Sequence, residues 1–231
     1  MAVSDNVQRI RDEVSETCLR AGRDPGGVRL MAVSKFHEWP LIEEAAAAGI
    51  RLFGESRVQE AARKFTGFRE RCPDAELHLI GSLQRNKVKA AAGLFDCIES
   101  IDRIELVREL GRITQDSGAG PLPVLFELNA GEESKSGFRD EDALCAGVEA
   151  AMEFDSLLPY GLMTMAPFTG DEKPVREAFR KLVRAQARLR RMFPEYCWDC
   201  LSMGMSGDFK IAIEEGSTLV RIGTAIFGDR Q

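Results

Sequence analysis

The stretch LMAVSK, residues 30–35, sets the pattern that the rest of the chain follows. Its short apolar run ends in Lys35, and Pro40 stands just before a new helical pattern. We interpret it as a buried strand that delivers one amine to the mouth of a fold. Because burial disfavours the charged form of a lysine, such an amine is a nucleophile toward carbonyl compounds. The alternative is a lysine that simply reaches from a strand end into water.

Strand and helix patterns alternate along the chain after an opening amphipathic helix, in which Val3, Val7, Ile10 and Val14 recur at spacings of three and four. The expected strands lie at 29–34, 51–56, 76–81, 95–100, 122–129, 158–165, 200–205 and 218–223. The expected helices lie at 41–49, 58–71, 83–93, 103–114, 140–153, 174–193 and 209–215, with a short turn or helix at the end.

Eight strand–helix units predict a barrel. Alternating units imply a parallel sheet with right-handed connections, and eight of them close on themselves. We therefore predict an α/β fold, a single (β/α)8 TIM barrel domain over residues 1–231 with an extra N-terminal helix. An open doubly wound sheet is the competing architecture. In a barrel, Lys35 at the end of the first strand becomes a neighbour of Arg221 in the eighth.

Composition excludes several classes of function. The formal net charge of −6 gives no reason to expect nucleic acid binding. No apolar run approaches the roughly 18 residues of a membrane span, and the opening segment lacks the apolar core of a signal peptide. We therefore expect a cytoplasmic protein, and we expect a monomer. Cys197 and Cys200 form a CxxC pair, but no second pair or nearby histidine accompanies it, so we expect no metal site.

Two loops rich in small residues are suited to hold a phosphate. SMGMSGD (202–208) and RIGTAIFG (221–228) follow the seventh and eighth expected strands, and offer Ser206, Gly223 and Thr224. Backbone N–H groups and hydroxyls in such loops cradle anions, and barrels hold phosphate at these two loops. Glycine and serine also simply make turns. The chain contains no GxxxxGK or GxGxxG, so the usual nucleotide-binding loops are absent.

The loop NAGEESKSGF (129–138) follows the fifth expected strand and carries Asn129 and Lys135. Either it is a solvated loop, or it supplies a second amine or a lid over the ligand. A strand-end lysine together with a phosphate cradle suggests a Schiff-base cofactor, pyridoxal phosphate (PLP). A sugar-phosphate aldolase without cofactor uses the same two parts.

Several motifs resemble the pyridoxal-phosphate homeostasis protein family over nearly the whole chain, from about residue 28 to 230. These motifs are AVSKF, GESRVQEA, LIGSLQRNKVK, NAGEESKSGF, GLMTMAPF and LSMGMSGDFKIAIEEGSTLVRIGTAIFG. The resemblance implies a barrel like the N-terminal domain of alanine racemases, with PLP held as an internal aldimine. It also implies a role in PLP homeostasis, with PLP-dependent apoenzymes as recipients of the cofactor.

By this resemblance, Lys35 matches the aldimine lysine. Ser206, Gly223 and Thr224 match the phosphate ligands, and Arg221 matches the residue that faces the pyridine nitrogen.

Lys135 matches a second lysine, implicated in transfer or secondary binding of the cofactor, and we count Asn129 with it among the candidate cofactor-binding residues. The chain departs from the family pattern at Ser56, where an amide is usual, and at Ser82, where histidine or proline is usual.

Arg221 also limits the predicted activity. An arginine that faces the pyridine nitrogen disfavours its protonation, which weakens the ring as an electron sink. Racemases with this arrangement add a tyrosine base from outside the barrel, whereas Tyr160 and Tyr196 lie toward the N-terminal ends of their strands. We expect a protein that holds PLP and passes it on without robust turnover. A racemase-like PLP enzyme is the alternative.

Two further residues carry open alternatives. His78 alternates with Ile80 and points into the barrel, where it is either a functional group or a hydrogen-bonded core histidine. Glu55 either pairs with a lysine at the mouth or only starts the next helix.

Overall fold

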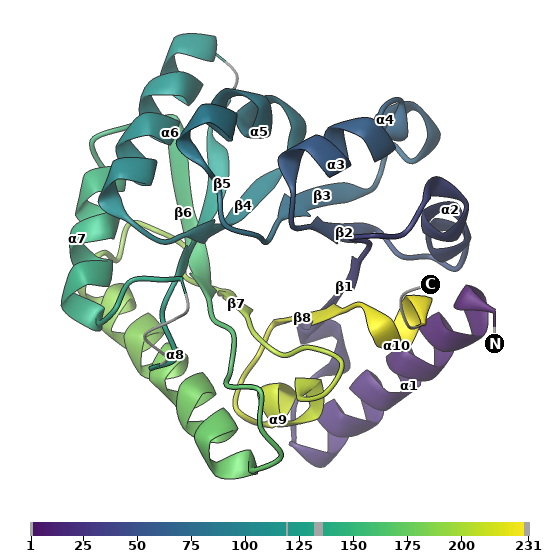
Figure 1. Cartoon of the computed structure of the whole chain (residues 1–231). Coiled ribbons are helices and arrows are strands. Elements are labelled where there is room, and N and C mark those ends of the chain that lie inside the picture. Colours follow the sequence, from purple (N-terminus) through teal and green to yellow (C-terminus); the bar gives the residue numbers. More distant parts are fainter. Residues whose placement is uncertain (1, 119, 132–135, 229–231) are drawn as a thin grey trace.

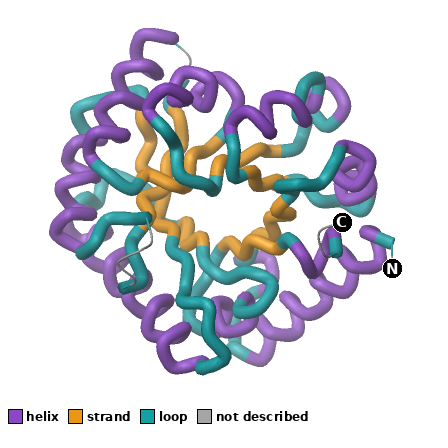
Figure 2. The backbone as a smooth tube through the Cα atoms, viewed as in Figure 1, coloured by secondary structure: helices purple, strands orange, loops and turns teal. Residues whose placement is uncertain are grey.

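The apolar runs of the sequence form a closed barrel of eight parallel strands in the computed structural model, which describes residues 2–118, 120–131 and 136–228. Each strand pairs with the next in the chain, and β8 pairs with β1. Figures 1 and 2 show the ring of strands surrounded by helices. The predicted (β/α)8 barrel is therefore confirmed. The competing open sheet is wrong because the edge strands of the sequence, first and last, are hydrogen-bonded to each other.

All eight strands lie within or close to the predicted ranges. They are β1 (Arg29–Val33), β2 (Leu52–Glu55), β3 (Glu76–Leu79), β4 (Cys97–Ile101), β5 (Leu122–Glu127), β6 (Leu157–Met163), β7 (Cys200–Ser202) and β8 (Leu219–Ile222). The helices are α1 (Val3–Arg20), α2 (Trp39–Ala47), α3 (Val58–Lys64), α4 (Phe68–Arg71), α5 (Val88–Leu94), α6 (Ile104–Ser117), α7 (Glu141–Ala151), α8 (Glu172–Met192), α9 (Phe209–Glu214) and α10 (Thr224–Phe227). No helix in the described part of the chain is long and apolar enough to cross a membrane.

Two predicted helices differ from the structure. The helix expected over 58–71 is broken into α3 and α4, because Gly67 adopts a left-handed φ of 68° that no helix interior allows. The helix expected over 83–93 starts later, at Val88, after a short 3₁₀ turn over Arg85–Lys87. Neither difference moves a strand.

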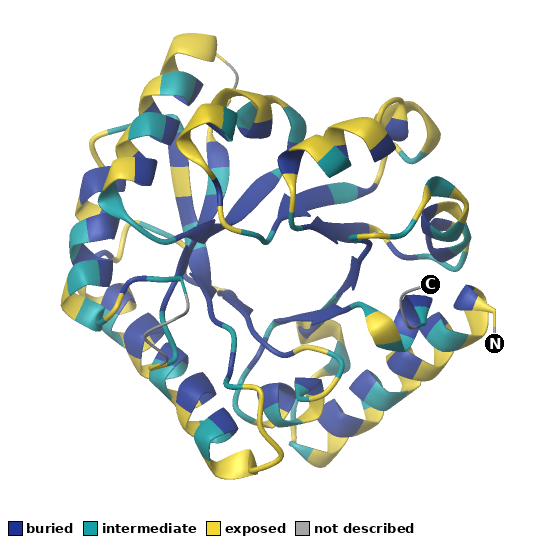
Figure 3. Cartoon of the chain, in the orientation of Figure 1, coloured by how far each residue is buried: buried dark blue, intermediate teal, exposed yellow. Residues whose placement is uncertain are grey.

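Alternation along the strands creates two cores. One lies between the strands and the helices, and together with the second it buries most of the strand residues, which are mainly dark blue in Figure 3. The other lies inside the barrel and consists of Met31, Val33, Leu52, Cys97, Leu125, Met163, Cys200 and Leu219. Residues that follow these positions in the same alternation point toward the C-terminal opening of the barrel.

The predicted N-terminal helix, α1, packs on the outside of the barrel. It lies against α2, α9 and α10, so it joins the first and last units of the fold (Figure 1). Arg11 donates to the backbone oxygens of Ala48 and Gly49, and Asn6 donates to that of Ile226 at 2.9 Å.

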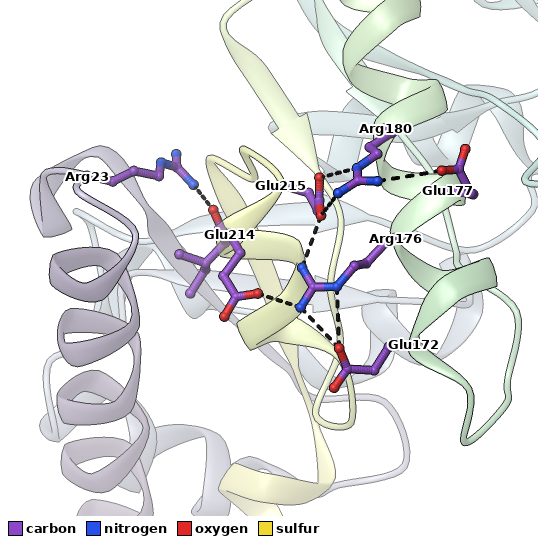
Figure 4. Close-up of polar contacts among 8 residues, drawn as sticks. Arg23, Glu172, Arg176, Glu177, Arg180, Glu214 and Glu215 are labelled. Carbon is purple, nitrogen blue, oxygen red and sulfur yellow. Dashed lines mark hydrogen bonds and ion pairs between the residues drawn. The ribbon is translucent and has the colours of Figure 1, made fainter.

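A network of ion pairs fixes α9, the short helix that follows the loop after β7 (Figure 4). Arg176 of α8 contacts Glu214 at 2.7 Å and Glu215 at 3.0 Å, and Arg180 contacts Glu215 at 2.8 Å. On the other side, Arg23 donates to the backbone of α9. The helix behind the predicted phosphate loop is thus held from two directions.

Candidate functional site

A cavity of about 650 Å³ opens at the C-terminal end of the barrel. Five of the predicted site residues line it, namely Lys35, Ser206, Arg221, Gly223 and Thr224. They come from three separate parts of the sequence, after β1, after β7 and around the end of β8. A volume of this size lies within the ordinary range of small-molecule sites, roughly 300–1,000 Å³.

Lys35 stands two residues beyond the end of β1, half-buried in a turn. The N–H of Ser34 extends the β1–β2 pairing by donating to Gly54 at 3.0 Å. The next residue, Phe36, has a φ of 68°, which is unfavourable for a bulky side chain. Its N–H donates to Glu60 Oε1 at 2.6 Å, which stabilises this backbone conformation. The turn that carries Lys35 is therefore fixed on both sides.

A buried ion pair lies behind this turn. Lys64 of α3 places its Nζ 2.6 Å from Glu55 Oε1, and both side chains are at most 1% exposed. The same Nζ donates to the backbone oxygen of Ser34 at 2.7 Å, while Ser34 Oγ donates to Glu55 at 2.7 Å. Glu55 thus ends β2 and pairs with a helix lysine instead of one at the mouth. Burial is the largest influence on Glu55 and raises the pKa of its carboxyl.

The loops after β7 and β8 lie against each other. The backbone N–H of Ala225 donates to Ser206 Oγ at 3.4 Å, and that of Arg221 donates to the oxygen of Gly204 at 2.9 Å. Ser206 and Thr224 therefore present two hydroxyls at one end of the cavity, next to the backbone of Gly223. Such a set of neutral donors is suited to a phosphate group.

Arg221 lies at the inner end of the cavity and is 4% exposed. Its Nη1 donates to the backbone oxygen and to Oγ of Ser202, at 2.6 and 2.7 Å, and its Nη2 donates to the oxygen of Thr164 at 2.7 Å. Burial lowers the pKa of the guanidinium from its ordinary value. Among the described residues the guanidinium makes these three hydrogen bonds, which use three of its five N–H donors.

Sequence reasoning missed other parts of the lining. Glu127, at the end of β5, faces the cavity and accepts from Ser136 Oγ at 2.7 Å. Burial raises the pKa of this carboxyl. The apolar wall includes Met163 and Met165. Strand alternation was the available signal, since Glu127 follows Leu125 on the inward face.

In the loop after β5, the side chain of Asn129 makes contacts within the loop and not with the cavity. Asn129 is not among the residues that line the cavity. Its Oδ1 accepts from Gly131 N–H at 2.7 Å and its Nδ2 donates to Ser136 at 3.3 Å, so its side chain closes the loop. A role for Asn129 as a direct ligand stays a prediction that this geometry does not favour. Lys135 lies outside the described residues.

The residues that depart from the family pattern, Ser56 and Ser82, both line the cavity. Their segments are in close contact, because a side chain on Gly81 would meet the backbone oxygen of Ser56 at 2.2 Å. Tyr160 packs in the barrel interior and Tyr196 packs against Trp198, and neither lines the cavity.

The remaining open residues lie outside the lining of the cavity. His78 is buried with both ring nitrogens near carboxylates, which confirms a hydrogen-bonded core histidine. Cys197 is exposed whereas Cys200 is buried in β7. Within the described ranges, no group of three metal-ligating side chains is arranged to hold an ion.

The fold and the site define a class of protein. Residues 2–231 match the family described as "Alanine racemase, N-terminal domain". An alanine racemase from Bacillus anthracis, only 17% identical, shares the fold with a TM-score of 0.75 over 99% of this chain and 56% of its own. Closer relatives are named pyridoxal phosphate homeostasis protein, and the chain belongs to that family. Those from Vibrio alginolyticus and Aquifex aeolicus are 39% and 36% identical, over 99% and 100% of this chain and 98% and 100% of their own.

Two solved structures are close to this one. A protein of unknown function from Bifidobacterium adolescentis is 36% identical and has a TM-score of 0.92, over 98% of this chain and 94% of its own. PipY from Synechococcus elongatus, solved with PLP bound, is 35% identical and has a TM-score of 0.81, over 93% of this chain and all of its own.

Proposed function

We propose that this protein binds PLP covalently through Lys35 and serves PLP homeostasis by holding the cofactor and passing it on. The observation that carries the proposal is the single cavity that joins an amine, two hydroxyls with loop backbone, and a buried guanidinium. These groups fit PLP, whose aldehyde, phosphate and pyridine nitrogen need a nucleophile, neutral donors and a hydrogen-bonding partner, respectively. The names of the relatives and the PLP-bound PipY structure support the same ligand.

Each residue then has a chemical task. The Lys35 amine attacks the aldehyde carbon, so that a C=N bond forms and the aldehyde oxygen leaves as water. Ser206, Thr224 and the backbone of Gly223 bind the phosphate, and Arg221 contacts the pyridine nitrogen. Bound PLP supplies an electron-accepting ring. Because arginine donates and stays charged, it opposes protonation of that nitrogen and limits this electron acceptance.

Robust catalytic turnover is not part of the proposed function. Racemases with this arrangement use a tyrosine as the second acid/base group, and neither tyrosine of the chain lines the cavity. The racemase-like alternative predicts exchange of the α-proton of an amino acid into deuterated water at enzymatic rates. Exchange at such rates, absent in Lys35→Ala, would favour that alternative.

The proposal includes partners and location. We infer that PLP-dependent apoenzymes receive the cofactor, that Lys135 assists its transfer, and that the protein acts as a monomeric, one-domain unit. A cytoplasmic location agrees with the free cysteines in the described part of the chain, since reducing compartments keep thiols unpaired.

The test is the absorbance spectrum of the purified protein with added PLP, before and after borohydride, followed by mass mapping. We expect a visible band that borohydride removes while it fixes PLP onto Lys35. Lys35→Ala should abolish the band, whereas Lys89→Ala, which removes an exposed lysine of α5, should leave it unchanged. A wild-type protein that stays colourless, or a label mapped to another lysine, would refute the proposal.

A further inference from the structure

A continuous series of polar contacts crosses the interior of the barrel. It begins at the N-terminal end, where Arg29 Nη2 lies 2.8 Å from Glu76 Oε1. Glu76 Oε2 lies 3.2 Å from His78 Nε2, and His78 Nδ1 lies 2.7 Å from Glu99 Oε1. Arg29 and Glu76 are partly exposed, whereas Glu99 is fully buried.

The series ends at the candidate site. Ser202 Oγ donates to Glu99 Oε2 at 2.5 Å and accepts from Arg221 Nη1 at 2.7 Å. Ser202 is fully buried and joins the two charged groups. We call these six residues the polar column, namely Arg29, Glu76, His78, Glu99, Ser202 and Arg221.

The two carboxylates beside His78 favour its protonated form. A neutral imidazole has one N–H and would turn a lone pair toward one of the two carboxylates, whereas the imidazolium donates to both. Although burial acts strongly in the opposite direction, Glu76 and Glu99 together raise the pKa of His78. For Glu99, complete burial acts to raise the pKa of the carboxyl, but His78 and Arg221 bring it below its ordinary value. Glu99 is therefore favoured in its charged form. Three cations therefore alternate with two carboxylates along the polar column.

Glu99 is the carboxylate that this series links to Arg221 through hydrogen bonds, while Glu127 and Asp208, which line the cavity, also favour the charged guanidinium. Within the described residues, no carboxylate forms an ion pair with Arg221, and the carboxylate that reaches it through a shared hydroxyl is Glu99. The other titratable groups that face the interior or the cavity are Lys35, Cys97, Glu127, Tyr160, Cys200 and Asp208. Burying so many charges costs free energy that an apolar barrel core would avoid, which points to a role beyond stability.

We propose that His78 and Glu99 are positioning residues that, through Ser202, fix the orientation and balance the charge of the Arg221 guanidinium in the cavity. This inference rests on the proposed function, because its consequence is read on bound PLP. A positive His78 disfavours a proton on the modified Lys35 nitrogen, and a negative Glu99 favours it. The polar column therefore shifts the pH at which the visible band changes.

The experiment is a spectral pH titration of the PLP-loaded protein and of two nearly isosteric variants. We expect His78→Gln to raise the midpoint and Glu99→Gln to lower it, each on the order of half a pH unit. Cys97→Ala alters the same interior beside His78 but removes no hydrogen bond of the polar column, so it should leave the midpoint in place. If both variants shift the midpoint in the same direction, or neither shifts it, the inference is overturned. Removing a positive and a negative charge must move the midpoint in opposite directions, whereas a loss of packing alone would not.

Two further readouts separate the possible failures. The Lys35-dependent band of the wild type tests the proposed function, and its absence would refute that function first. Nuclear magnetic resonance of labelled histidine tests the polar column in the unmodified protein, even where a variant does not fold. The chain has two histidines, so His37→Asn assigns the signals. We expect both ring nitrogens of His78 protonated at neutral pH and a shift of its resonances on PLP binding; a neutral His78 would overturn the inference.

Discussion

Lys64 is more deeply buried than Lys35. Its contacts explain how the backbone that carries the flexible Lys35 side chain is held in place. Its ammonium contacts Glu55, Glu60 and the backbone oxygen of Ser34. Glu60 also accepts from the N–H of Phe36. Hydrogen bonds from one buried cluster thus reach both neighbours of Lys35 in the chain, so we expect the position of the proposed aldimine lysine to depend on a residue outside the cavity.

Lys64→Met is expected to lower the free energy of unfolding by about 3–5 kcal/mol, because it leaves the Glu55 carboxylate buried without its counter-charge. Urea denaturation of the protein without PLP measures this loss. The double variant Lys64→Met with Glu55→Gln should recover part of it, since the uncompensated charge is gone.

The matched control is Lys210→Met, which breaks an exposed pair with Glu13 at 2.8 Å. We expect a loss of about 1 kcal/mol or less for this surface pair. Equal losses for Lys64→Met and Lys210→Met would contradict a structural role for the buried cluster.

At the scale of elements, the loop between β7 and α9 shows how glycine shapes the candidate phosphate site. Gly204 has a φ of 99°, and a Cβ there would lie 2.6 Å from Ala212 Cβ. Its oxygen accepts from Arg221 N–H, which connects the loop to β8. Gly207, three residues on, has nothing within 4 Å of a Cβ position.

Gly204→Ala is expected to destabilise the protein by about 2–5 kcal/mol, which combines a left-handed backbone with overpacking. Gly207→Ala should change the stability by less than about 0.5 kcal/mol, since it adds a methyl group in open space. Denaturant unfolding without PLP compares the two. Similar stabilities would mean that the close approach of this loop to α9 is not required.

At the scale of the whole molecule, the polar column makes stability depend on pH in both directions. His78 and Arg29 lower the pKa of Glu76 to about 2 from an ordinary 4.5, so its contribution is present above pH 4.5 and is lost as the pH falls toward 2. The raised pKa of His78 acts oppositely. Its contribution is present below 6.5 and is lost as the pH rises through the folded value.

We therefore expect the stability difference between wild type and His78→Gln to be greatest between about pH 4.5 and 6.5 and to shrink on either side. Urea unfolding at a series of pH values measures it. Two parallel stability curves would show that His78 does not change its protonation on folding.

Much of the fold was predictable because the periodicity of strands and helices is a local property of the sequence. The apolar run that ends in Lys35 and the alternation after it were enough to predict a barrel in which the strand before Lys35 neighbours the strand that carries Arg221. The break at Gly67 was missed, because whether a glycine adopts a left-handed φ depends on what its neighbours pack against. The pairing of Glu55 with Lys64 was missed for a related reason, since it joins a strand to a helix face.

By itself the sequence determined the class of barrel, the amine at the end of β1 and the two small-residue loops, because each depends on residue type and spacing along the chain. Only the tertiary structure showed which side chains share the cavity. Glu127 lines the cavity, whereas Asn129 is not among the lining residues. It also revealed the polar column, whose members come from β1, β3, β4, β7 and β8. Contacts between distant strands depend on register and closure of the barrel, and these are properties of the folded chain.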